Sequence, residues 1–247
     1  MKPIATYVFI DLQSSGLPVN SRIVEITELA MVAVKRTHFL NTDPDELPRV
    51  QYKLHKCFST ERSMCKKSVS MTGLKPNLLK DEPVFDERAC EVINSFINCL
   101  EKPVCLIGHN ALKFHLQLLK YHLKTLKFEL SDEDNILCSD SLYAFFDVLQ
   151  ADDIRKYTND SLKKPLTKPM LFWKLYREQF YRTIGMKRSY QLGALYNEIV
   201  GEPYLESNWA ENNCIKIMSI ALTIKEDFEK WIANNHCLFS GVCPMVM

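Results

Sequence analysis

The chain opens on an apolar stretch that ends in polar side chains, Ala5-Thr-Tyr-Val-Phe-Ile-Asp11-Leu-Gln13, and a turn sequence follows it, Ser14-Ser-Gly-Leu-Pro18. Alternation of β-branched and aromatic residues, bounded by a glycine and a proline, predicts a strand that feeds a loop. The strand ends on Asp11, and Gln13 has the size of a glutamate without its charge. The stretch therefore predicts the edge of a site at which a carboxylate is expected and an amide is found.

Further elements extend this strand into a sheet. Strands are predicted at Ile23–Lys35 and Tyr52–Phe58, and two buried strands follow at Val104–Gly108 and Ile136–Ser139. Apolar spacings of three and four predict a helix over Val84–Leu100, with Pro83 in its first turn. Other helices are predicted at Leu112–Leu126, from Ser141, from Tyr190 and within Trp209–Trp231. Three strands followed by alternating strands and helices indicate an α/β fold with a mixed sheet covered by helices.

Bulk properties limit the class of protein. The chain has 247 residues, a formal net charge of +1 and 47% hydrophobic residues. These values favour a single domain over 1–247 and exclude a disordered or uniformly basic chain. Since no apolar run reaches the length of a membrane span, we expect a soluble protein of the cytoplasm or nucleus without a membrane partner. Nine cysteines without paired spacing are interpreted as reduced, mostly buried thiols.

A basic and aromatic insert is predicted at about 151–188. Between Arg155 and Arg188 there are ten basic residues and two acidic ones, a local charge of +8, with aromatic residues among them. Basic side chains can hold a phosphate backbone while aromatic rings stack on bases, so the expected contacts with single-stranded nucleic acid are Lys163, Lys164, Lys168 and Trp173. The alternative is a helix that turns Phe172, Leu175 and Tyr176 to the core and its charges to solvent.

Several motifs, in order, carry a resemblance to a known family. They run from Val8–Pro18 through Ile26-Thr-Glu-Leu29, Met71-Thr-Gly-Leu74, Cys105-Leu-Ile-Gly-His-Asn110 and Arg188-Ser-Tyr-Gln-Leu-Gly193 to Ser207-Asn-Trp-Ala-Glu-Asn-Asn213. With these motifs, the chain resembles the three-prime repair (TREX) exonucleases of the DEDDh group. The resemblance implies an RNase H-like fold, degradation of DNA from 3′ ends, two divalent metal ions and a homodimer.

The resemblance also implies five catalytic positions. Asp11 matches the family's first aspartate, and Gln13 stands at its glutamate. His115 falls on the second aspartate, Asn208 on the histidine base and Asn213 on the last aspartate. Only Asp11 is retained, so one formal negative charge would face two magnesium ions. We therefore expect no resident cofactor, and Mg²⁺ or Mn²⁺ only if the site is active.

Two rescues of metal binding were weighed. The acidic residues near the expected site are Glu25, Glu28, Glu206 and Glu211. Glu211 lies two positions before Asn213 on a helix, so it should face away from the site. Binding of zinc or manganese through Asp11 and His115 is the other alternative.

The resemblance further implies a nucleotide pocket and a dimer strand. Leu17 and Pro18 match the family's apolar wedge, Met71 its base-packing position and Phe114 the aromatic residue beside the second aspartate. The alternative is that these four are ordinary core residues. The family pairs its third strand across a two-fold axis, and the strand at 50–58 occupies that position here.

The sequence therefore predicts a catalytically inactive homologue of a TREX-type 3′–5′ exonuclease that acts as a nucleic-acid-binding or dimeric scaffold protein. One alternative is an active metal-dependent exonuclease with rearranged ligands. The other is an adaptor that binds only proteins, for which the aromatic segment Leu171–Tyr181 is the best candidate surface.

Overall fold

The computed structural model describes residues 2–18, 23–149, 189–201 and 208–246. The predicted insert at about 151–188, with Lys163, Lys164, Lys168 and Trp173, lies outside the described residues, as does the segment Leu171–Tyr181.

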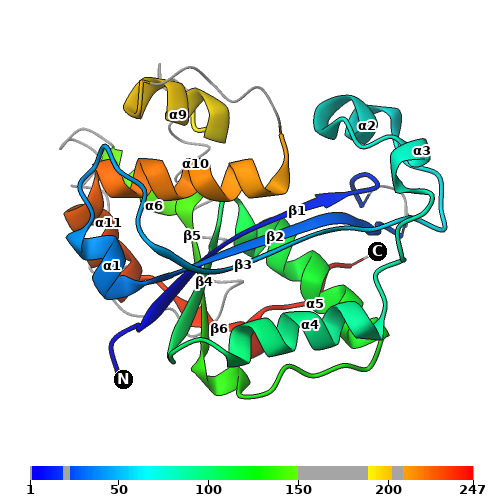
Figure 1. Cartoon of the computed structure of the whole chain (residues 1–247), viewed down its shortest axis with the longest axis horizontal. Helices are drawn as coiled ribbons and strands as arrows, with labels where there is room; N and C mark the ends of the chain where they lie inside the picture. Colours follow the sequence, from blue (N-terminus) through cyan, green and yellow to red (C-terminus); the bar gives the residue numbers. More distant parts are fainter. Residues whose placement is uncertain (1, 19–22, 150–188, 202–207, 247) are drawn as a thin grey trace.

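One six-stranded mixed sheet organises the described chain, in the order β3-β2-β1-β4-β5-β6 (Figure 1). Its strands are β1 (Thr6–Ser14), β2 (Ile26–Lys35), β3 (Val50–Cys57), β4 (Val104–Gly108), β5 (Ile136–Asp140) and β6 (Cys237–Leu238). The pairs β1–β2, β2–β3 and β5–β6 are antiparallel, whereas β4 pairs parallel with β1 and with β5. The prediction of a mixed sheet is confirmed, and β3 is an edge strand.

Helices cover both faces of the sheet. The helix α10 (Ala210–Thr223) lies across β1 and β2, with α9 (Leu192–Ile199) beside it, while α4 (Glu87–Asn98) and α5 (Leu116–Thr125) lie on the opposite side. The remaining helices are α1 (Arg36–Asn41), α2 (Lys66–Thr72), α3 (Pro76–Leu79), α6 (Ser141–Leu149) and α11 (Lys225–Asn234). Because both faces are covered, β1, β2, β4 and β5 are buried almost throughout, as their near-continuous apolar sequences require.

Aromatic rings fill the core between the sheet and the helices α1, α6 and α11. The Phe39 ring of α1 stacks within 5.5 to 6.2 Å of the rings of Tyr7, Phe9 and Phe228. Phe145 of α6 continues this cluster to Phe228 of α11. This cluster holds the start of β1, so the end of the same strand, with Asp11 and Gln13, is presented on a rigid support.

Three predicted boundaries were wrong for identifiable reasons. The helix predicted from Val84 begins at Glu87, because the Asp86 carboxylate accepts the backbone N–H groups of Arg88 and Ala89 as an N-cap, so Pro83 precedes the helix. The helix predicted over Leu112–Leu126 is a π-helix, Ala111–His115, that continues into α5. The segment Trp209–Trp231 holds two helices, α10 and α11, that divide at Ile224.

The described chain contains all nine cysteines, and each is a free thiol. Five are buried, two are half-buried and two are exposed, so the prediction of reduced thiols is confirmed and that of burial holds for most of them. No helix among the described residues combines the length and the apolar character needed to cross a membrane.

Candidate functional site

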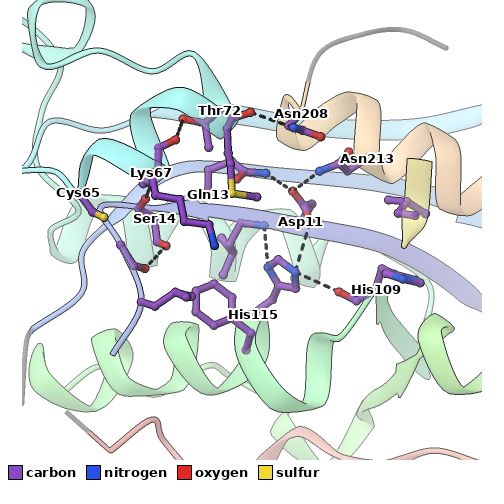
Figure 2. Close-up of a pocket in the computed structure, with 17 residues that line it drawn as sticks. Asp11, Gln13, Ser14, Cys65, Lys67, Thr72, His109, His115, Asn208 and Asn213 are labelled. Atoms are coloured by element: carbon purple, nitrogen blue, oxygen red, sulfur yellow. Dashed lines mark hydrogen bonds and ion pairs between the residues drawn. The ribbon is translucent and has the colours of Figure 1, made fainter. Parts of the chain in front are cut away.

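A cavity of about 860 Å³ opens at the end of β1, between α2, the π-helix and α10 (Figure 2). It brings together all five predicted catalytic positions and three of the four predicted nucleotide-binding residues. The lining residues are Asp11, Leu12, Gln13, Ser14, Gly16, Leu17, Cys65, Lys67, Ser68, Met71, Thr72, His109, Phe114, His115, Leu192, Asn208 and Asn213. Pro18 is exposed and does not line the cavity, so its predicted place in the pocket was wrong.

Asp11 is the centre of the site, and two amides are directed at it. Its side chain is 3% exposed, and its Oδ2 accepts a hydrogen bond from Gln13 Nε2 at 2.7 Å and from Asn213 Nδ2 at 3.1 Å. Gln13 reaches it because side chains two apart on a strand share a face, and α10 supplies Asn213 from above that face. The two residues that replace family carboxylates thus donate to the carboxylate that is retained.

His115 approaches the other oxygen of Asp11. Its Nδ1 accepts the Leu12 backbone N–H at 3.1 Å, so the ring proton sits on Nε2. From there it faces the His109 carbonyl at 3.1 Å and Asp11 Oδ1 at 3.4 Å. Burial lowers the pKa of His115 to about 4, which leaves the ring neutral at physiological pH. Because both nitrogens are engaged, the predicted alternative of a zinc or manganese ion between Asp11 and His115 has no free imidazole ligand.

The π-helix that carries His115 is fixed by Asp140 at the end of β5. The buried Asp140 carboxylate accepts the backbone N–H groups of Asn110, Leu112 and Leu142 at 2.9 to 3.0 Å. Asn110 adopts a left-handed conformation, with φ of 61°, and so turns the chain sharply out of β4. Burial raises the pKa of Asp140 to about 7, although these backbone bonds lower it. This anchor aims His115 into the cavity.

Asn208 stands at the family's histidine position but does not face Asp11. Its Nδ2 donates to the Met71 carbonyl at 2.9 Å and thereby ties the residues before α10 to α2. An amide cannot take a proton from water at neutral pH, so this position supplies no general base.

The cavity holds little charge. Burial, together with the nearby Glu28 carboxylate, raises the pKa of Asp11 to about 8, in spite of the amide donors that lower it. Burial also lowers the pKa of His109 to about 4, and its Nε2 donates to the Tyr190 carbonyl at 2.9 Å. The charged residue that remains is Lys67, whose side chain reaches over the cavity from α2 (Figure 2). A donor set of one such carboxylate does not fit a pair of magnesium ions, which require several carboxylate oxygens.

Acidic neighbours do not repair this deficit within the described chain. Glu25 accepts the backbone N–H groups of Glu61 and Arg62, each at 3.1 Å. Glu211 points away from Asn213, as predicted, and pairs with Lys53 of β3 at 2.8 Å. Glu28 is buried against His55 of β3 at 2.7 Å. Glu206 lies outside the described residues.

The apolar wall of the cavity is open to solvent. Leu17 is 57% exposed and Met71 is 56% exposed, while Phe114 is half-buried with its ring edge-on to His115. The alternative that these residues are plain core is therefore wrong for Leu17 and Met71. Large exposed apolar side chains around a cavity are typical of a binding surface.

The sequence interpretation missed residues from α2 and from the turn before it. Ser68 Oγ donates to the Ser14 carbonyl, and the Cys65 backbone N–H donates to the Ser15 carbonyl at 2.7 Å. These bonds seat α2 and Lys67 over the end of β1. The sequence Lys66–Thr72 is short and has no strong apolar period, so the available signal was the two adjacent lysines near Met71.

The mixed sheet, the helices on its faces and the polar end of β1 define the RNase H-like fold of the DEDDh exonucleases. One solved structure with this fold is the zinc-bound form of the E. coli ExoI–ssDNA complex. The match has a TM-score of 0.60 and 14% identity, over 90% of this chain and 40% of that one. That exonuclease binds a divalent metal and single-stranded DNA, as its description states, whereas the likeness to this chain concerns the fold alone.

In sequence the chain is similar to three-prime repair exonucleases, which confirms the resemblance seen in its motifs. It is 36% identical to the human three prime repair exonuclease 2 over 121 residues, which are 46% of this chain and 50% of that protein. It is 24% identical to the human three-prime repair exonuclease 1 over 253 aligned positions, covering 98% of this chain and 71% of that protein. The chain thus spans half the length of the first of these relatives. No family model matches the chain.

Proposed function

We propose that this protein is a catalytically inactive relative of the three-prime repair exonucleases that binds the end of a single nucleic-acid strand without cleaving it. The observation that carries the proposal is the pair of amide hydrogen bonds from Gln13 and Asn213 to Asp11 Oδ2. Amide donors occupy the carboxylate that a metal ion would need, and burial favours its neutral form. The site is thereby complete without a metal.

Binding is supported by the wall of the same cavity. Leu17, Met71 and Phe114 offer apolar surface against which a base can pack, and Lys67 offers a cation for a phosphate group. A nuclease site repels a phosphate backbone until metals neutralise its carboxylates, whereas this cavity has no such repulsion. Further contacts are proposed from the basic insert through Lys163, Lys164, Lys168 and Trp173.

A labelled single-stranded oligonucleotide in the presence of a chelator tests binding at the cavity. Met71→Ala and Leu17→Ala are each expected to raise the dissociation constant by about 5- to 100-fold, because stacking on a side chain contributes about 1 to 3 kcal/mol per base. Fluorescence anisotropy measures the effect. Leu78→Ala is the matched control, since Leu78 is 66% exposed on α3 and does not line the cavity. Equal affinity of all three variants and the parent would remove the cavity from the binding site.

The insert is tested in the same assay. Charge reversal at Lys163, Lys164 and Lys168 is expected to lower affinity more than Asp11→Ala does, and to flatten a salt dependence of about −0.7 per phosphate contact. Affinity unchanged at low salt would favour the alternative in which this segment is a solvated face.

We also propose that two copies of the chain pair through β3. Its backbone forms one edge of the sheet, with β2 on its inner side. An edge strand is a template for a second strand, and the exposed residues along Val50–Cys57 leave its sides open. Light scattering at micromolar concentration is expected to give twice the single-chain mass of 28.7 kDa. A mass of one chain would contradict the dimer. Nine free thiols suit a reducing compartment, so we place the protein in the cytoplasm or nucleus.

Two other functions compete with this proposal. An active exonuclease with rearranged ligands requires carboxylates that the described chain does not bring to Asp11. An adaptor that binds only proteins predicts no response to the oligonucleotide, and the anisotropy assay separates it from the proposed function.

A further inference from the structure

A second cluster of polar side chains lies on β2 and β3, beyond the cavity. It consists of Glu28, His55 and Cys57, each of which offers one donor atom, and these atoms all lie within 4.8 Å of one another. The strand register explains the cluster. Glu28 stands directly opposite Cys57, and His55 lies two residues before Cys57. Side chains two apart in a strand share a face, so all three project from one side of the sheet, next to its edge.

Glu28 is the unusual member of the cluster. Its side chain is buried, with a relative exposure of 2% for the residue, and its Oε1 lies 2.7 Å from His55 Nε2. Its other oxygen, Oε2, is buried and has no hydrogen-bond partner among the residues that the structure describes. Gln13 stands opposite Glu28 on β1, but its amide group donates to Asp11 instead. An unpartnered buried carboxylate oxygen is costly, and a cation would satisfy it.

His55 is oriented as a metal ligand would be. Its Nδ1 lies 3.8 Å from Oε2 of Glu211, which reaches down from α10 and is held by Lys53 at 2.8 Å. A carboxylate beside one ring nitrogen directs the lone pair of the other nitrogen toward a metal, and here that nitrogen is Nε2, which faces Glu28. The side chain is 39% exposed, so a metal ion has a route in from solvent.

We propose that Glu28, His55 and Cys57 form a binding site for one zinc ion. One sulfur, one nitrogen and one oxygen donor match the preference of Zn²⁺, whereas Mg²⁺ prefers oxygen ligands alone. The thiolate and the carboxylate balance the charge of the ion, and three protein ligands leave a fourth position for water. The site is separate from Asp11 and does not depend on the proposed function.

Zinc binding has a consequence for the sheet. The ion would join edge strand β3 to its neighbour β2 through side chains, in addition to the backbone ladder. Burial and the neighbouring carboxylates Glu28 and Glu82 raise the pKa of Cys57, so binding must release the thiol proton. Pairing of β3 with a second copy would use backbone groups at the edge and leave this face free.

Cobalt is the spectroscopic probe for the site, because a cobalt–thiolate bond gives a charge-transfer absorption. The metal-free full chain is expected to take up one equivalent of Co²⁺ with this band near neutral pH, and Zn²⁺ is expected to displace it. Cys57→Ser is expected to lose the band, and Glu28→Gln to weaken zinc binding by at least about tenfold. Cys99→Ser, which alters an exposed cysteine elsewhere, is the matched control and should behave as the parent does.

Further outcomes separate this site from the cavity. Asp11→Ala is expected to bind zinc with the affinity of the parent, and circular dichroism checks that each variant is folded. The proposal is overturned if the parent binds no zinc at micromolar concentration. It is equally overturned if Cys57→Ser keeps the band, or if Asp11→Ala loses it while Cys57→Ser does not. Failure of oligonucleotide binding would leave this site untouched.

Discussion

Magnesium is expected to bind a variant that carries Gln13→Glu, His115→Asp, Asn208→His and Asn213→Asp at least about 100-fold more tightly than it binds the parent, for which we expect no measurable affinity. The variant adds three carboxylates beside Asp11. A unit charge about 4 Å from an ion contributes roughly 4 kcal/mol at the effective dielectric of a protein surface, so three additional charges outweigh the loss of the present hydrogen bonds. The lining of the cavity already places all four side chains around one space.

Single substitutions are expected to fail where the fourfold variant succeeds. Gln13→Glu alone sets a carboxylate beside Asp11 without the other ligands, so the pair takes up a proton rather than a metal ion. Groups that act as a unit are strongly non-additive. Calorimetric titration with magnesium measures the affinity, and the fourfold variant with Asp11→Ala is the control. A folded fourfold variant that binds no magnesium would mean that these five positions do not form a metal site.

Asp11→Asn is expected to become more stable relative to the parent as the pH rises from 5 to 8. The pKa of Asp11 is about 8 in the folded chain and 3.8 as its ordinary value, so between these values the folded state holds a proton that the unfolded state has lost. The contribution of the acid is thus fully present below its unfolded pKa and is lost as the pH rises through the folded one. The loss is about 1.4 kcal/mol per pH unit, or roughly 4 kcal/mol over this range, as an order of magnitude.

Urea unfolding of parent and variant, each at several pH values and with a chelator present, measures this difference. The asparagine does not ionise, so subtraction of the two curves removes most other titrating groups. The difference should level off above pH 8, where Asp11 is ionised in both states. A difference in unfolding free energy that stays constant with pH would show that Asp11 is ionised in the folded chain at neutral pH.

The sequence predicted those strands whose identity depends on local pattern. The apolar runs at 104–108 and 136–140 are buried on both faces, and composition alone identifies such strands. Helix boundaries were less predictable, because the apolar period of α4 continues backward through Val84 and Phe85. The Asp86 cap, which stops the helix there, competes with that period. The π-helix at 111–115 has no sequence period of its own.

The site was predicted as a set of residues, and its chemistry required coordinates. The motifs located Asp11, Gln13 and Asn213, but that both amides donate to one carboxylate oxygen depends on where α10 crosses β1. The neutral state of His115 depends on the Leu12 N–H and on Asp140, which lies two strands away from β1. The cluster around Glu28 depends on the β2–β3 register, which no local pattern fixes.

Release of nucleotides from a 3′-labelled single strand, with magnesium or manganese and with purified protein, tests most directly whether the site is inactive. The account predicts no release above that of an Asp11→Ala control, because the donor set around Asp11 holds no metal pair and Asn208 is no base. Nucleotide release by the parent that is abolished by Asp11→Ala would contradict it.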